Sequence, residues 1–401
     1  MPDFKYIVAP DNCTGCGLCS NVCSRNAISM EWNADGFLEP MVNAQACINC
    51  GLCVKKCPAL HPPHLGADDM EQVLSYGAWN RDSETQFLSS SGGVFSALAE
   101  SVLKEGGIVY GVVWRDKITA EFQKAETLDE LKPMRGSKYT EAHPGKVYQL
   151  AKVELNKGRK VLFAGTSCQV YALLQYLGKD YSNLITVDIL CHGVPSHLLL
   201  EKYVHEAEQA TGKQVRHVSF RDKEHGWENY HIRTVYTDGT STICPLKKDY
   251  FMRTFLSDKV LNRACYNCMF KHLPRVADIT LGDYWGVAKQ EPEWPVYKGI
   301  SAVLAHTDKG ALVLQNLKNV EFKNKPFQKL YEGQPSTYIL STTRTEPEDR
   351  GQYLEFLRTS PLKKVYSRLM YAVDIGFVRI SYRSGLYRLY KKLTRHLKGN
   401  E

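Results

Sequence analysis

The sequence CTGCGLC at residues 13–19 returns 34 positions later as CINCGLC at residues 47–53. Each copy continues to one more cysteine, Cys23 and Cys57, which completes the spacing C-x2-C-x2-C-x3-C. Bacterial ferredoxins use this spacing, because one loop gives three thiolates to a [4Fe–4S] cluster and its last cysteine binds the other cluster. The repeat therefore predicts an α+β ferredoxin-like module with two clusters.

This crossed pattern of ligation divides the eight cysteines into two sets. The first set is Cys13, Cys16, Cys19 and Cys57, and the second set is Cys47, Cys50, Cys53 and Cys23. Gly17 and Gly51 leave room for each loop to approach its sulfurs. A pair of four-cysteine zinc sites is disfavoured, because such sites usually come as two separated C-x2-C pairs. Ser24 replaces the usual proline and removes no ligand.

The charge of the chain is concentrated at one end. The net charge of +8 lies in residues 362–401, which carry ten Lys or Arg against Asp374 and Glu401. The other 361 residues hold 41 basic and 41 acidic side chains, so they have no general attraction for nucleic acid. With 401 residues, 43% of them hydrophobic, the chain is long enough for two or three domains.

The thirteen cysteines do not indicate a secreted disulfide scaffold. The N-terminal residues lack the basic, apolar and small-residue regions of a signal peptide. No segment approaches the roughly 18 apolar residues that cross a bilayer. We therefore expect a cytoplasmic protein, in which cysteines at two-residue spacing bind metal.

Three domains are expected, at residues 1–66, 67–345 and 346–401, with Pro58–Gly66 as the first linker. The middle domain alternates strand and helix patterns, which favours an α/β core with a mixed sheet. Asp238 and Gly239 predict a hairpin turn. Its strands would be His231–Thr237 and Thr240–Cys244; the other expected strands are Val73–Ala78, Ile108–Trp114, Val161–Ala164, Leu184–Leu190, Ala277–Leu281 and Ile300–Ala305, and the expected helices are Gly93–Lys104, Lys146–Asn156, Gln169–Leu177 and Ser196–Ala210.

Four cysteines of the middle domain, Cys168, Cys191, Cys265 and Cys268, form what we call the body set. The first two follow predicted strands at their carboxyl ends, where α/β sheets bind ligands. Together the four could hold a third [4Fe–4S] cluster. The alternative is that they are ordinary buried cysteines, as we expect for Cys244.

Several short motifs follow one another along the middle domain. They are Ser90-Ser-Gly-Gly-Val94, Gly136-Ser-Lys-Tyr139, Gly165-Thr-Ser-Cys-Gln169, Cys191-His-Gly193, Arg221-Asp-Lys223, Cys265-x-x-Cys268 and Ala277-Asp-Ile-Thr-Leu-Gly-Asp-Tyr-Trp285. In this order they resemble the beta-subunit family of the coenzyme F420 hydrogenases and dehydrogenases. The resemblance covers about residues 5–340. It implies an α/β flavin domain with FAD, a nearby cluster, and a soluble two-electron partner. Ser167 stands where such proteins usually have proline.

The resemblance also implies which residues surround the flavin. They are Ser90, Ser91, Gly92, Gly93, Ser137, Lys138, Tyr139, Gly165, Thr166, Ser167 and Gln169. Amides at a helix N-terminus with no side chain at the glycines suit phosphate, although a serine N-cap with close helix packing would give the same pattern. Lys138 and His192 are the candidate catalytic side chains. An ordinary surface loop and a structural histidine are the alternatives.

The last residues predict a basic amphipathic helix. Leu386, Tyr390, Leu393 and Leu397 recur at helical spacing among Lys and Arg residues. Such a helix could lie on the anionic inner face of a membrane or pack its leucines on the protein. Nucleic-acid binding is the weaker third interpretation.

We therefore expect an oxidoreductase that passes electrons from a ferredoxin-like donor through clusters to FAD and a small-molecule acceptor. The acceptor would be a deazaflavin or, since some proteins of this kind occur in cell-surface polysaccharide pathways, a sugar intermediate. The alternatives are an adapter subunit of a hydrogenase or dehydrogenase complex without its own substrate, and a non-enzymatic cluster protein. The sequence has no G-x-G-x-x-G after a strand and no P-loop motif, so it gives no support for a Rossmann-type nicotinamide site or a P-loop nucleotide site.

Overall fold

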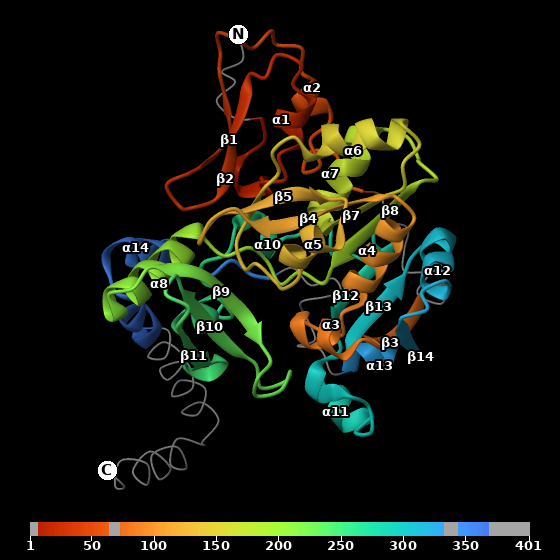
Figure 1. Cartoon of the computed structure of the whole chain (residues 1–401). Helices are drawn as coiled ribbons and strands as arrows, with labels where there is room; N and C mark the ends of the chain where they lie inside the picture. Colours follow the sequence, from red (N-terminus) through yellow and green to blue (C-terminus); the bar gives the residue numbers. More distant parts are fainter. Residues whose placement is uncertain (1–6, 64–72, 333–343, 369–401) are drawn as a thin grey trace, which may run out of the picture.

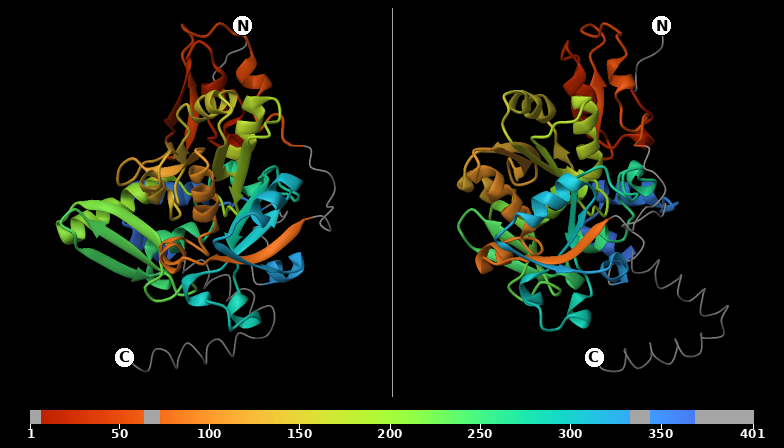
Figure 2. Two further views of the ribbon diagram at one scale, coloured as in Figure 1. Left: turned by 45° about the vertical axis from the view of Figure 1, so that its right-hand side comes forward. Right: turned by 90° about the vertical axis from the view of Figure 1, so that its right-hand side faces the viewer.

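The structure is a computed structural model that describes residues 7–63, 73–332 and 344–368. A small N-terminal part, drawn in red, stands on top of a larger body (Figure 1). The body holds a nine-stranded sheet, and a three-stranded sheet lies to one side of it, as the turned views show (Figure 2). The predicted basic helix and part of the predicted first linker lie outside the described residues.

The N-terminal part consists of one hairpin and two short helices. Strands β1 (Ile28–Trp32) and β2 (Leu38–Val42) pair antiparallel. Helix α1 (Leu18–Val22) follows the first cysteine loop, and α2 (Leu52–Lys55) follows the second. Both helices start after a glycine in the left-handed conformation, which only glycine adopts without strain. A 3-10 turn, η1 (Pro10–Asn12), precedes the first loop.

The large sheet is mixed, as the sequence predicts. Its strand order is β14 (Val320–Asn324), β3 (Leu74–Asn80), β13 (Ser301–Ala305), β12 (Ile279–Asp283), β8 (Leu184–Ile189), β7 (Val161–Thr166), β4 (Ile108–Trp114), β5 (Ala120–Ala125) and β6 (Ala142–His143). Strands β12, β8, β7 and β4 run parallel, whereas β13, β3 and β14 pair antiparallel.

Helices cover both faces of this sheet. Along β4, Val109 and Tyr110 point to opposite faces and enter two different cores. Helices α4 (Val94–Lys104) and α12 (Asp308–Gln315) pack on one face, and α6 (Val147–Asn156) and α7 (Ser167–Leu177) on the other. Leu18 of α1 is fully buried in the second of these cores, so the N-terminal part shares the core of the body.

A third core lies under the small sheet. It is formed by β9 (Val215–Asp222), β10 (His231–Tyr236), α8 (His197–Thr211), α9 (Tyr250–Phe255) and α14 (Arg350–Thr359). Strand β11 (Ser241–Pro245) is the outer strand of the small sheet. The predicted hairpin is present, with Gly239 at φ +84° in the turn between β10 and β11. Helix α14 falls inside the predicted tail domain but buries Tyr353, Leu354 and Leu357 in this core.

The remaining elements are short. They are α3 (Ser83–Leu88), α5 (Leu128–Leu131), η3 (Lys132–Met134), η4 (Leu246–Lys248), α10 (Arg263–Tyr266), α11 (Val287–Gln290), η5 (Val296–Lys298) and α13 (Phe327–Glu332). Within the described part of the chain, no helix has the length and apolar character to span a bilayer.

Candidate redox site

The four cysteines of the body set come together from three parts of the body. Cys168 lies in the first turn of α7 and Cys191 just after β8; since β7 and β8 are parallel neighbours, these two ends share one edge of the sheet. Cys265 in α10 faces the loop after β8 that carries Cys191, because a Cβ added at Gly193 would lie 3.4 Å from the Cβ of Cys265. Cys268 follows two residues after α10.

The thiols of the body set influence one another electrostatically. Burial raises the pKa of Cys265, and the charges of Cys191 and Cys268 raise it further. Burial also raises the pKa of Cys168 and of Cys191, each with a contribution from Cys268. Among the described residues, no three His, Cys, Asp or Glu converge on a single metal ion. A [4Fe–4S] cluster does not require its ligands to converge on one ion, because each of its four irons binds its own thiolate.

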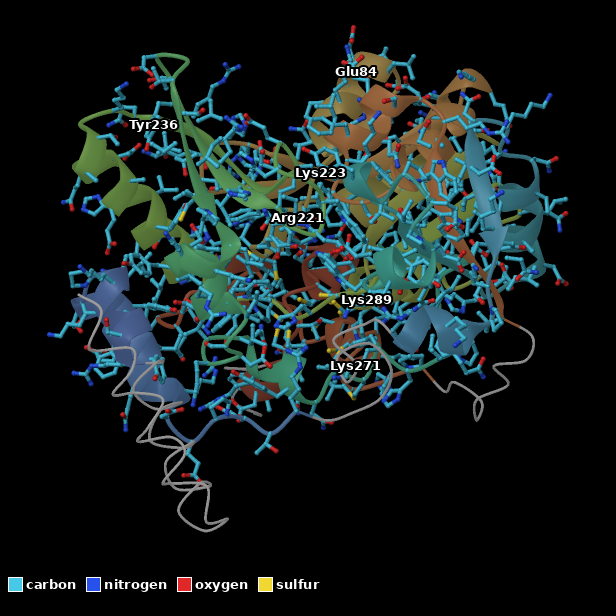
Figure 3. All side chains as sticks on the ribbon, turned by 90° about the horizontal axis from the view of Figure 1, so that it is seen from below. Glu84, Arg221, Lys223, Tyr236, Lys271 and Lys289 are labelled. Atoms are coloured by element: carbon cyan, nitrogen blue, oxygen red, sulfur yellow. The ribbon has the colours of Figure 1, made fainter. Side chains whose placement is uncertain are left out.

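Three largely buried cations act on the body set. Arg275 and Arg344 lower the pKa of Cys191 against the effect of burial. Lys271 is 6% exposed, and burial lowers its pKa although Cys268 and Cys265 favour its charged form. Figure 3 shows sulfur atoms gathered in the middle of the molecule, between the labels of Arg221 and Lys271. These cations offset the negative charge of four thiolates, so the surroundings fit a cluster.

A buried polar network holds the start of α7. Ser167 Oγ donates to Asp188 Oδ2 over 2.5 Å, and Arg275 Nη1 donates to Ser167 Oγ over 2.6 Å. Thr280 Oγ1 donates to the other oxygen of Asp188. Ser167, predicted to face the flavin, thus has its hydroxyl in the network beneath the body set.

The predicted flavin residues at the start of α7 have local roles. Thr166 is the N-cap of the helix, and Gln169 closes a capping box by accepting from the Thr166 amide over 2.9 Å. The Thr166 hydroxyl lies 3.1 Å from Cys168 Sγ, so it orients this thiol. Gly165 lies beside Asp188 in the β7–β8 ladder.

The two other predicted flavin loops meet each other. Ser90 Oγ accepts from the Ser137 amide over 2.8 Å and lies 2.9 Å from the Ser137 hydroxyl. Ser91 Oγ donates to Ile300 O over 2.7 Å. Helix α4 has Gly93 as its N-cap, at φ +82°, and no side chain caps it. The serine N-cap of the alternative interpretation is therefore not formed, and the helix N-terminus suits an anion.

Gly92 is required by the packing of this loop. Its amide donates to Ser301 Oγ over 2.9 Å, and a Cβ added to it would lie 2.3 Å from Ala78 O and 2.7 Å from Ser301 N. Because Ala78 and Ser301 are paired across β3 and β13, both obstacles are backbone of one ladder. The loop is thereby seated tightly on the sheet.

We expect Gly92→Ala to destabilise the protein by about 1–3 kcal/mol, the usual cost of forcing atoms into a packed site. Gly351→Ala is the matched control, because nothing lies within 4 Å of its added Cβ in α14 and its φ is not left-handed. The control should gain about 0.4–1 kcal/mol. Anaerobic denaturant titration of both variants measures the difference; equal midpoints would contradict the packing role.

The two candidate catalytic side chains are both engaged. Lys138 Nζ donates to the carbonyls of Pro133, Met134 and Arg135 over 2.9–3.1 Å, so its ammonium caps its own loop. His192 Nε2 lies 2.7 Å from Asp258 Oδ1, which also accepts from Arg344. Their catalytic roles stay predictions.

Tyr139 lies beside the buried side chain of Arg221, which, like the buried Lys223, was not among the predicted site residues. Its hydroxyl lies 3.5 Å from Arg221 Nη1, and Arg221 also pairs with Asp283 over 2.7 and 3.2 Å. Lys223 Nζ donates to Ser91 O over 2.6 Å, and burial lowers its pKa to about 7. Figure 3 shows Arg221 and Lys223 side by side. The motifs at residues 221–223 and 277–285 carried the signal for these side chains.

In the N-terminal part, the first set converges on one small cavity. The cavity is lined by Cys13, Cys16, Cys19 and Cys57 together with Ile7, Val8, Met30 and Pro40 among others. Burial raises the pKa of Cys16 to about 11, and the Cys57 charge adds to this. Iron binding would stabilise the thiolates that burial disfavours. The four thiols and the apolar wall fit a [4Fe–4S] cluster.

The second set lies nearer the surface. Burial raises the pKa of Cys53, and the charges of Cys50 and Cys47 raise it further, so these three are neighbours. Cys50 is exposed. Cys23 follows α1, which packs against α2, the helix that carries Cys53.

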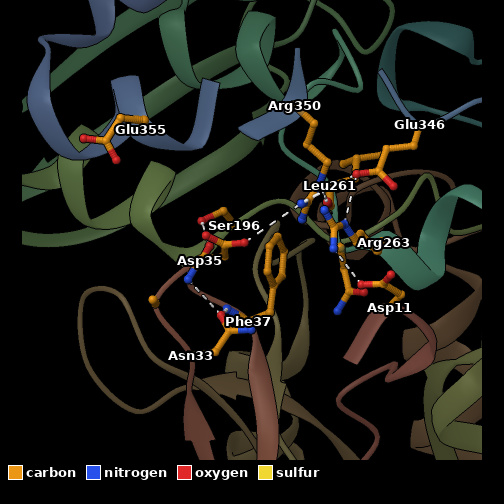
Figure 4. Close-up of polar contacts among 12 residues, drawn as sticks. Asp11, Asn33, Asp35, Phe37, Ser196, Leu261, Arg263, Glu346, Arg350 and Glu355 are labelled. Carbon is orange, nitrogen blue, oxygen red and sulfur yellow. Dashed lines mark hydrogen bonds and ion pairs between the residues drawn. The ribbon is translucent and has the colours of Figure 1, made fainter. Parts of the chain in front are cut away.

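Several polar contacts fix the N-terminal part to the body (Figure 4). Ser196 Oγ donates to Asp35 O over 2.6 Å at the tip of the β1–β2 hairpin. Arg263 pairs with Asp11 over 2.7 Å on the other side. Between them Phe37, 4% exposed, enters the core under the small sheet. The cysteine loops are therefore held in one place.

Comparison with known proteins identifies three segments. Residues 75–147 match the N-terminal part of the coenzyme F420 hydrogenase/dehydrogenase beta subunit, and residues 158–328 match its C terminus. Residues 12–60 match a 4Fe-4S dicluster domain. The two beta-subunit matches together cover more than half of the chain.

Two individual proteins are also similar. The ferredoxin-type protein NapF of Haemophilus influenzae is 42% identical over 43 residues, which are 11% of this chain and 24% of that protein. The match thus spans about a quarter of its length. A chain of the F420-reducing [NiFe] hydrogenase complex from Methanosarcina barkeri superposes with a TM-score of 0.45 and 20% identity, covering 75% of this chain and 91% of that chain.

The expected resemblance is confirmed by the family matches, which cover the body on either side of residues 148–157. The chain belongs to the coenzyme F420 hydrogenase/dehydrogenase beta-subunit family, whose members are oxidoreductase subunits, and it carries a 4Fe-4S dicluster domain for electron transfer.

Proposed function

We propose that this chain is an iron–sulfur flavoprotein oxidoreductase with three [4Fe–4S] clusters, FAD and a small-molecule acceptor. The observation that carries the proposal is the contact between the first cysteine loop and the helix that carries Cys168. Helix α1, which includes Cys19 of the first set, contacts α7, whose first turn holds Cys168 of the body set. Cys16 also packs against the core that α7 lines. Cysteines from two distant parts of the sequence therefore lie on neighbouring elements.

The first set, the second set and the body set would each hold one cluster. FAD would lie with its phosphates at the uncapped N-terminus of α4 and its ring toward Tyr139 and the start of α7. Bound there, FAD would accept electrons singly from clusters and exchange two with an organic acceptor. The chain's own contribution is to hold the loops, through Ser90 with Ser137 and through Lys223 with Ser91.

The reaction needs two electrons and two protons for each acceptor that is reduced. A low-potential redox protein would supply the electrons in two single steps, and solvent would supply the protons. The family supports a deazaflavin as the acceptor, and a nucleotide- or lipid-linked sugar is the second class to test. The reverse direction is chemically equivalent.

The test is anaerobic purification of the full chain followed by analysis of iron, sulfide and flavin. We expect about twelve irons and twelve sulfides per chain, as three cubanes require, and one FAD. Coenzyme F420 and a sugar nucleotide are then offered to the reduced protein, and flavin reoxidation is followed by absorbance.

Each result decides something. Reoxidation by one of these compounds without another protein supports an enzyme with its own acceptor. A flavin that neither compound oxidises contradicts these acceptors and favours the adapter subunit, and a chain that binds no flavin overturns the proposal. About eight irons would remove the body cluster.

A further inference from the structure

Residues 141–149 of the body lie directly against the first cysteine loop. They follow the loop that carries Ser137 and Tyr139, and they include β6 and the start of α6. We call them the bridging segment. No motif in the sequence had marked them as part of a redox site.

The bridging segment makes repeated hydrogen bonds to residues 16–26. Tyr148 is fully buried and donates from its hydroxyl to Cys16 O over 2.7 Å. The other bonds are Asn21 Nδ2 to Gly145 O at 2.8 Å, Gln149 Nε2 to Asn21 O at 2.7 Å, Lys146 Nζ to Asn26 Oδ1 at 2.9 Å and Lys146 Nζ to Ser20 O at 3.2 Å. Three side chains and one carbonyl of the bridging segment thus make five hydrogen bonds that hold the loop in one orientation.

Glu141 fills the space between the loop and the body. Its carboxylate is 4% exposed and accepts from the Leu38 amide over 2.8 Å. The other oxygen, without a hydrogen-bond partner in the described residues, faces Gly15, where an added Cβ would lie only 1.7 Å away. Glycine at position 15 is thus needed because any side chain there would collide with Glu141 of the bridging segment.

The two cysteine loops differ in this respect, although they are copies of one sequence. Gly17 and Gly51 occupy equivalent positions, with φ +68° and +70°, and each is the N-cap of a short helix. A Cβ added at Gly17 would lie 2.1 Å from Pro144 Cγ in the bridging segment. At Gly51 nothing lies within 4 Å. The body therefore packs tightly on the first loop at Gly17 and leaves space at Gly51, although Lys56, after the second loop, donates to Gln175 O over 2.9 Å.

The far side of the bridging segment packs on the elements that carry Cys168 of the body set. The centroid of the Tyr148 ring lies 6.0 Å from that of Phe163 in β7 and 6.4 Å from that of Tyr176 in α7. Cys168 lies in the first turn of α7, directly after β7. Leu18 and Cys16 join the same core as Tyr148, so this one buried side chain connects the first set with the helix that carries Cys168.

We propose that the bridging segment seats the first set against the body set and so fixes the order of electron transfer. The second set, nearer the surface, would hold the cluster that takes single electrons from the external redox protein, and the first set would hold the cluster that hands each electron on to the body set. Two such single-electron transfers would reduce one acceptor molecule. The inference rests on the proposed function, because it requires a cluster at the body set.

Gly17→Ala and Gly51→Ala form a matched pair for the test. Both put alanine at the same left-handed backbone conformation, so the strain is equal, and only the first pushes against Pro144. The full chain is loaded with iron and sulfide anaerobically, reduced with a low-potential one-electron donor, and sampled by rapid freezing. Electron paramagnetic resonance then measures the reduction rate of the body cluster and its magnetic interaction with the first-set cluster.

In Gly17→Ala the body cluster should be reduced several-fold more slowly, because the displaced first loop lengthens the distance that each electron must cross. The magnetic interaction should weaken. Gly51→Ala should retain both properties. Equal slowing in the two variants, or slowing only in Gly51→Ala, overturns the order.

Tyr148→Phe covers the case in which Gly17→Ala does not load iron. It removes one hydrogen bond, to Cys16 O, and keeps the ring in its core. The inference expects slower reduction of the body cluster at unchanged iron content, and an unchanged rate overturns it. A wild-type chain with about eight irons would instead refute the proposed function, so the two failures are distinguishable.

Discussion

Replacing Cys265 by alanine is expected to lower the iron content from about twelve to about eight atoms per chain, because one cubane holds four irons. Cys265 faces the loop that carries Cys191, and the charges of Cys191 and Cys268 both raise its pKa. Without its thiolate one iron has no protein ligand. Flavin reduction by the external donor should then fall by a factor of about 100 or more, which corresponds to about 2.7 kcal/mol in the barrier.

Cys244→Ala is the matched control for this variant. Cys244 is also partly buried, and burial raises its pKa, but it lies in β11 of the small sheet. It should keep about twelve irons and full donor-linked flavin reduction. Iron and sulfide analysis with stopped-flow absorbance measures both quantities. If Cys265→Ala retained all its iron, the body set would not hold a cluster.

The sequence predicted the parts of the fold whose signals are local. The strand Ile108–Trp114 has the predicted bounds, and the hairpin around Gly239 forms as expected. Strand β12 begins at Ile279, two residues later than expected, because Asp278 turns its carboxylate to the Thr186 amide and hydroxyl. The short strand β6, with two residues, has no periodicity to detect.

The candidate site was predictable only where chemistry and spacing coincide in the sequence. The cysteine repeat placed the first set, and the structure brings its four thiols to one cavity. Glu141 and Tyr148 could not be found in this way, because their roles depend on contacts with residues more than a hundred positions away. Ser167 shows the limit of a resemblance, since its hydroxyl joins a network that the motif does not encode.

Arg275→Met is expected to destabilise the protein by about 3–5 kcal/mol, the usual effect of removing one partner of a buried ion pair. The side chains of Arg275 and Asp188 are 1% and 0% exposed, and their charged atoms lie 3.3 Å apart. Methionine retains much of the apolar volume but leaves the Asp188 carboxylate with two hydroxyl donors and no cation. Anaerobic denaturant unfolding of the loaded protein measures the loss.

Lys132→Met is the control, because its pair with Asp129 is 64% and 88% exposed and such pairs contribute about 0–1 kcal/mol. The double variant Arg275→Met with Asp188→Leu discriminates further. In a simple ion pair, two apolar residues would restore most of the stability. Here Ser167 and Thr280 would lose their buried acceptor, so we expect only partial recovery. Full recovery would show that the charges alone matter, whereas partial recovery with loss of body-set iron would show that this network also positions Cys168.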